Sequence, residues 1–143
     1  MSAHTAPSRF ERSGSTVRFD NAGSPVTVTV CTSRIVRVEL ENERDVAGPS
    51  YVGPRSWASS PFDVLGDERV RLSTADLRVE AATDPVRLTF LDASGDWLLR
   101  EPARGGMLTE SVSVARRRLH ASFEFSGEQH FYGLGEISLE ATS

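Results

Sequence analysis

Residues 127–136, with the sequence GEQHFYGLGE, carry the densest group of side chains that could do chemistry. Phe131-Tyr132 is a strand-forming pair, and the glycines behind it permit backbone angles and close approaches that a Cβ would forbid. We therefore predict a strand that enters a tight turn, with Glu136 at its exit, where a carboxylate can accept amide hydrogen bonds or face a cleft. A glycine-rich loop packed over an aromatic ring is the alternative interpretation.

Three common kinds of site lack their sequence pattern. Residues 127–136 are not G-x-G-x-x-G and are followed by neither a lysine nor a helix signal, so we predict no nucleotide site. The chain has no G-x-S-x-G nucleophile elbow. Its one cysteine, Cys31, and three scattered histidines predict no disulfide and no metal site, and we expect no cofactor. Only His130 adjoins the glycines, and a packing or hydrogen-bonding role is the commoner one for such a residue.

The segment Phe131-Tyr132-Gly133-Leu134-Gly135-Glu136, preceded by Gly127-Glu128, resembles a motif of glycoside hydrolase family 31, the α-glucosidases, α-xylosidases and their relatives. In that family the motif leads from an N-terminal β-sandwich toward the catalytic barrel. Weaker similarities follow in the family's order upstream, at Pro49-Ser50-Tyr51-Val52, at Thr74 to Val79, and at Leu88-Thr89-Phe90-Leu91-Asp92 with Gly95, Leu98 and Glu101. The resemblance covers the chain from about Val26 onward. It departs at residues 137–143, where the family usually has a basic residue and a longer loop.

The resemblance implies a non-catalytic domain of a retaining α-glycosidase that hydrolyses α-linked glucosides or xylosides. Such an enzyme needs two carboxyl groups about 5 Å apart across a sugar-sized cleft. Both are barrel aspartates in the family, so we predict no catalytic residue in these 143 residues and no activity of the chain alone. Glu136 and Tyr132 would border the substrate pocket, although we favour a role for Glu136 in tying the loop to the barrel. The expected partners are the missing barrel and carbohydrate.

Two other functions stay open. Tyr51 and Trp57 lie in a loop rich in Gly, Pro and Ser, and with Tyr132 they could stack on sugar rings in a free-standing carbohydrate-binding sandwich. A small sugar epimerase is the second alternative, because the sandwich superfamily contains mutarotases that use a histidine acid and a carboxylate base. His130 with Glu136 or Glu128 would supply that pair.

The elements that would position these residues are all predicted to be strands. From Thr16 onward apolar and polar residues alternate with period two, most clearly in the predicted hairpins 26–40 and 86–99; Gly95 can take a positive φ in the turn of the second hairpin. Residues 119–125 predict one amphipathic strand. Roughly ten short strands separated by turns predict an all-β fold, an antiparallel two-sheet β-sandwich, which the resemblance makes galactose-mutarotase-like.

Length and charge complete the prediction. We assign residues 1–15 to a flexible polar tail, 16–136 to the sandwich, and 137–143 to the start of a connection toward the barrel. The 16 basic and 20 acidic residues give a net charge of −4, which argues against nucleic acid or an anionic membrane as partner. The first 15 residues lack the apolar core of a signal peptide, so we expect a cytoplasmic protein. The apolar C-terminal segment could form a homodimer contact once uncovered.

Overall fold

The computed structural model describes residues 10–21, 24–41, 56–104, 106–113 and 116–127, and these residues form strands, turns and short loops. The strands in chain order are β1 (Phe10–Ser13), β2 (Thr16–Phe19), β3 (Val26–Val30), β4 (Val36–Leu40), β5 (Asp63–Leu65), β6 (Arg69–Ser73), β7 (Leu77–Thr83), β8 (Val86–Asp92), β9 (Trp97–Arg100), β10 (Leu108–Ser113), β11 (Arg116–His120) and β12 (Glu124–Phe125). No helix within the described residues is long and apolar enough to cross a membrane.

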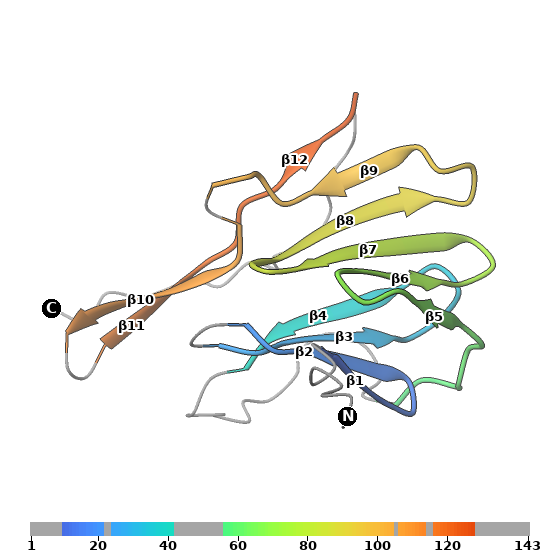
Figure 1. The fold of residues 1–143 in the computed structure, drawn as a ribbon, viewed down its shortest axis with the longest axis horizontal. Helices are drawn as coiled ribbons and strands as arrows, with labels where there is room; N and C mark the ends of the chain where they lie inside the picture. Colours follow the sequence, from blue (N-terminus) through green and yellow to red (C-terminus); the bar gives the residue numbers. More distant parts are fainter. Residues whose placement is uncertain (1–9, 22–23, 42–55, 105, 114–115, 128–143) are drawn as a thin grey trace, which may run out of the picture.

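The strands form two sheets and a separate ribbon (Figure 1). One sheet has four strands in the order β1-β2-β3-β4, and the other has six in the order β12-β9-β8-β7-β6-β5. Every pairing in both sheets is antiparallel. Strands β10 and β11 pair only with each other among the described residues, and this ribbon extends past the end of the sandwich. The predicted all-β, two-sheet antiparallel sandwich is therefore confirmed.

The core lies between the two sheets and comes from the alternation that the sequence shows. Side chains of successive strand residues point to opposite faces, so every second residue of β3 or β6 is buried. The core residues are Val17, Phe19, Val26, Val28, Val30, Phe62, Val70, Leu72, Val79, Ala81, Val86 and Leu88. They come from both sheets, and their burial is the main stabilising contribution to the fold.

Both predicted hairpins are present. Strand β3 pairs with β4 in the register Val28↔Val38, and β8 pairs with β9 after a turn in which Gly95 has a φ of 95°. Between β7 and β8, the two-residue turn Asp84-Pro85 contains a cis peptide bond. The irregular register between Phe90 and Leu91 marks a bulge in the pairing of β8 with β9.

Two segments differ from the sequence prediction. Part of the predicted tail, residues 10–13, is the edge strand β1, because Phe10 packs on Phe19 at a ring-centroid distance of 6.2 Å. The predicted single strand 119–125 is divided between β11 and β12. The amide of Ser122 donates to the carbonyl of Gly106 across 3.2 Å, so the chain bends at the base of the ribbon before it joins the six-stranded sheet. The alternation of apolar and polar residues continues through this bend, so the sequence pattern alone does not predict where the strand is divided.

Candidate functional site

Of the four predicted substrate-binding residues, the structure describes Trp57 alone. Trp57 precedes β5 in a segment without strand pairing, and it is 40% exposed. Tyr51, Tyr132 and Glu136 lie outside the described residues, as do His130, Glu128 and the apolar C-terminal segment, residues 131–139, predicted for a dimer contact. The four residues are therefore not shown together, and their roles stay predictions.

A buried carboxylate holds the ribbon on the sandwich. Glu101 directly follows β9 and is only 7% exposed. Its Oε2 accepts a hydrogen bond from the amide of Leu88 across 2.7 Å, and its Oε1 accepts one from the amide of Met107 across 2.8 Å. One carboxylate thus joins strand β8 to the residue before β10. We call Glu101, Leu88, Gly106 and Met107 the ribbon anchor.

The packing around the ribbon anchor leaves little freedom. Gly106 has a φ of +77°, and a Cβ at this position would lie 3.0 Å from Oε1 of Glu101. A glycine is therefore required both by the backbone conformation and by the close approach of the carboxylate. The backbone also bonds in the other direction, because the amide of Glu101 donates to the carbonyl of Leu88 across 2.9 Å. The sequence resemblance includes Glu101 but predicted no role for it.

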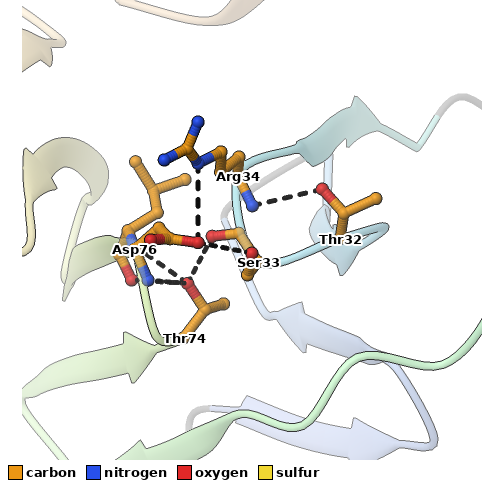
Figure 2. A network of polar contacts seen from close by, with 6 residues as sticks. Thr32, Ser33, Arg34, Thr74 and Asp76 are labelled. Atoms are coloured by element: carbon orange, nitrogen blue, oxygen red, sulfur yellow. Dashed lines mark hydrogen bonds and ion pairs between the residues drawn. The ribbon is translucent and has the colours of Figure 1, made fainter.

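The opposite end of the sandwich carries a polar network that joins the two sheets (Figure 2). It consists of Thr32, Ser33 and Arg34 in the turn between β3 and β4, with Thr74 and Asp76 in the turn between β6 and β7, and we call it the turn network. The hydroxyl of Ser33 donates to Oδ2 of Asp76 across 2.6 Å, and Arg34 lies 3.5 Å from the same oxygen. These contacts connect residues more than 40 positions apart, so they fix the end of one sheet against the other.

Thr74 has a double role in the turn network. Its hydroxyl donates to the carbonyl of Ser33 across 2.6 Å, and it accepts the amide hydrogen of Leu77 across 2.9 Å. The second contact closes the turn between β6 and β7 in the way that threonine hydroxyls commonly do. A single side chain thus shapes one turn and ties it to the neighbouring sheet.

Beside the turn network is an open hollow of about 470 Å³. Its lining residues are Arg12, Pro61, Phe62, Asp63, Ser73, Thr74 and Ala75. The guanidinium of Arg12 lies 4.1 Å from the ring centre of Phe62 and donates to the carbonyl of that residue across 3.3 Å. Because Arg12 is held against Phe62 and Thr74 is used in the turn network, the side chains of the hollow serve mainly to close this end of the sandwich.

The chemistry of the described residues is that of a scaffold. Glu101 accepts two amide hydrogens and Asp76 accepts a hydroxyl hydrogen, so the carboxylates at both ends are used in internal hydrogen bonds. Within the described part of the chain no three His, Cys, Asp or Glu residues lie together as metal ligands would. The arrangement defines an antiparallel sandwich with one end locked by the turn network and a ribbon anchored at the other.

Comparison with known proteins identifies the family. The chain belongs to the family described as the glycosyl hydrolase 31 N-terminal galactose mutarotase-like domain, which matches residues 25–140. This match confirms the resemblance seen in residues 127–136 and in the segments upstream. It also confirms the mutarotase-like type of sandwich.

Similar solved structures include two of a family 31 dextranase from Flavobacterium johnsoniae, one a mutant complexed with isomaltotriose and the other complexed with glucose. Each has 17% sequence identity and a TM-score of 0.60, and the match covers 71% of this chain. At this identity the likeness shows the fold alone. The match covers 13% of the dextranase chain, so this chain corresponds to a small part of that enzyme's length. A search of the curated proteins gave no match.

Proposed function

We propose that this chain is the N-terminal domain of an α-glycosidase, that it supports a catalytic barrel, and that its segment with Tyr132 and Glu136 borders the substrate pocket. The observation that carries the proposal is the family match, which extends over residues 25–140. The substrates would be α-linked glucosides or xylosides, hydrolysed by two barrel carboxylates in a double displacement. Domains of this kind contribute position and stability to a site formed elsewhere.

The two ends of the sandwich support this role. A supporting domain must be rigid if it is to hold a loop against the neighbouring barrel. The ribbon anchor contributes to this rigidity, because it holds the ribbon by a buried carboxylate whose two oxygens are both hydrogen-bonded. The turn network closes the other end by joining the two sheets directly. The core between these ends is apolar and contributed by both sheets, which makes the sandwich a single rigid support.

The test compares the chain alone, the full-length enzyme, and the full-length enzyme without residues 1–136, with aryl α-glucosides and α-xylosides as substrates. We expect turnover from the full-length enzyme and none from the chain alone. Removal of the sandwich should shorten the half-life of activity on heating, because the barrel loses its support. Turnover by the chain alone that disappears in the Glu136→Gln variant would overturn the proposal.

One observation favours a second candidate, a carbohydrate-binding module. Trp57 is 40% exposed, as a sugar-stacking platform requires. If Trp57 binds sugar, gluco-oligosaccharides at millimolar concentration should quench tryptophan fluorescence in the native chain and have no effect on Trp57→Ala. We expect no quenching in either chain, because we interpret Trp57 as an aromatic side chain that covers the end of the core.

A further inference from the structure

The outer face of the six-stranded sheet is rich in arginine. Strands β6, β7 and β8 bury Val70, Leu72, Val79, Ala81, Val86 and Leu88, so the residues between them point away from the core. The pairing register places five outward arginines on this face: Arg69, Arg71, Arg78, Arg87 and Arg100. We call them the arginine face. The chain as a whole has a net charge of −4.

Acidic residues neutralise only part of the arginine face. Arg71 forms an ion pair with Glu80 across 3.1 Å, and Arg100 forms one with Glu124 across 2.7 Å. Asp63 also lies on this side, on the edge strand β5 opposite Ser73. Within the described residues Arg69, Arg78 and Arg87 have no ion-pair partner.

Two of these unpaired arginines lie on the two central strands of the sheet, near opposite ends of the β7–β8 hairpin, and are partly buried. Arg78 is on β7 and Arg87 on β8, and the Nε atom of each is shielded from solvent without a hydrogen-bond partner. Buried polar atoms nearly always have a partner, so an exception in a folded domain calls for an explanation. The half-buried Leu91 and Trp97 pair with each other beside Arg78, and the guanidinium of Arg100 lies 4.3 Å from the ring centre of Trp97.

On the outer face of the four-stranded sheet, one arginine is bound by two carboxylates and serves as a comparison for Arg78 and Arg87. Arg18 there is bound by Glu41 through contacts of 2.8 and 3.1 Å and by Asp20 at 3.0 Å. The hydrogen bond that Arg18 donates to Glu41, with the charges of Glu41 and Asp20, raises the pKa of Arg18. Neighbouring threonines satisfy each other, as in the 3.0 Å contact between the hydroxyls of Thr16 and Thr29.

We propose that the arginine face is the surface through which this domain docks on the rest of its enzyme, and that the docked surface presents carboxylates to Arg78 and Arg87. The inference rests on the proposed function and adds to it the face and the chemistry of the contact. Arginine and tryptophan are enriched in the central parts of protein interfaces, and a guanidinium can bind a carboxylate through two parallel hydrogen bonds. The matched dextranase chain is several times longer than this one, which leaves ample protein to cover the face.

A second copy of this chain fits the arginine face less well. In a two-fold contact the same surface of each copy meets the other, so the unpaired arginines of the two copies would face like charges. A head-to-tail contact between two different surfaces does not close into a dimer and propagates instead. The catalytic part of the same enzyme can cover the face once, without further assembly.

The test is labelling of arginine side chains with phenylglyoxal, read by mass spectrometry, in the isolated chain and in the full-length enzyme. We expect Arg78 and Arg87 to react in the isolated chain and to lose their labelling in the full-length enzyme. Arg37 is the matched control, because it is exposed on β4 of the other sheet and should react equally in both. The double variant Arg78→Glu/Arg87→Glu should lower the melting temperature of the full-length enzyme much more than that of the isolated chain, whereas Arg37→Glu should affect both alike.

The labelling results that would contradict the inference differ from those that would contradict the proposed function. Equal labelling of Arg78 and Arg87 in both forms, with protection on the four-stranded sheet, would overturn the inference and leave the proposed function standing. If no residue of the domain is protected in the full-length enzyme, the proposed function fails as well. Protection that appears in the isolated chain only at high concentration would identify a second copy as the occupant and would also refute the inference.

Discussion

The ribbon anchor gives the sharpest test of how this domain is held together. The perturbation is Glu101→Leu, which keeps the side chain's approximate size and removes both acceptor oxygens. The amides of Leu88 and Met107 would then be left without their present partners. Glu101→Gln is the milder change. The glutamine keeps one acceptor oxygen for one backbone amide, but its side-chain NH2 group faces the other backbone amide and cannot accept from it.

The magnitude follows from the two lost acceptors. A buried donor left unsatisfied costs about 1–3 kcal/mol, so two such donors cost about 2–6 kcal/mol, and the apolar leucine recovers a part by its burial. We therefore expect Glu101→Leu to lower the free energy of unfolding by about 3–4 kcal/mol and Glu101→Gln by about 1–3 kcal/mol. The first value is a large share of the roughly 5–15 kcal/mol that stabilises a typical domain.

The assay is urea unfolding of the isolated chain, followed by tryptophan fluorescence, with amide exchange at Met107 as a local measurement. Glu124→Gln is the control, because its ion pair with Arg100 is about half exposed on both sides and should contribute less than about 1 kcal/mol. If Glu101→Leu unfolds at the same urea concentration as Glu124→Gln, the carboxylate does not hold the ribbon and the reasoning is refuted.

Three further predictions concern the turns and the exposed tryptophan. Gly66→Ala should lower the free energy of unfolding by about 2–4 kcal/mol, because a Cβ would clash with the carbonyl oxygen of Arg69 at a φ of +104°. Gly14→Ala, whose Cβ would have nothing within 4 Å, should cost only about 1–2 kcal/mol, and equal melting temperatures of the two variants would contradict this. Thr74→Val should cost about 1–3 kcal/mol by removing both hydroxyl contacts of the turn network, and an unchanged urea midpoint would show that the network carries no stability. Trp57→Ala should leave the unfolding free energy within about 1 kcal/mol of the native value, since the side chain is 40% exposed, and a larger loss would place Trp57 in the core.

The sequence predicts the parts of the fold that depend on local alternation. The hairpin of β3 and β4 follows from valines that recur at every second position, and the turn before β9 follows from a glycine able to take a positive φ. The motif at residues 131–136 also predicts the mutarotase-like type of sandwich, because six specific residues occur there in the order typical of the family. These features need no knowledge of which strands become neighbours.

The remaining features depend on contacts between distant residues, which alternation does not encode. A glutamate after a strand, such as Glu101, normally indicates a solvated end, and its burial follows only from the amides that the fold brings to it. Ser33 and Asp76 meet because two turns of different sheets reach the same end. The arginines are scattered among acids along the chain, and only the pairing register places Arg78 and Arg87 on one face. The predicted pocket residues Tyr51, Tyr132 and Glu136 lie outside the described residues and stay predictions.

The size of the native polypeptide tests the central claim most directly. Peptides from residues 16–136 should be found, by mass spectrometry of size-fractionated extracts from the source cells, in a polypeptide several times larger than 15.6 kDa. That polypeptide should also contain at least about 200–250 further residues with the strand and helix pattern of a (β/α)8 barrel, and it should hydrolyse aryl α-glucosides or α-xylosides. Recovery of these peptides solely from a species of 15.6 kDa, with no barrel attached, would contradict the account.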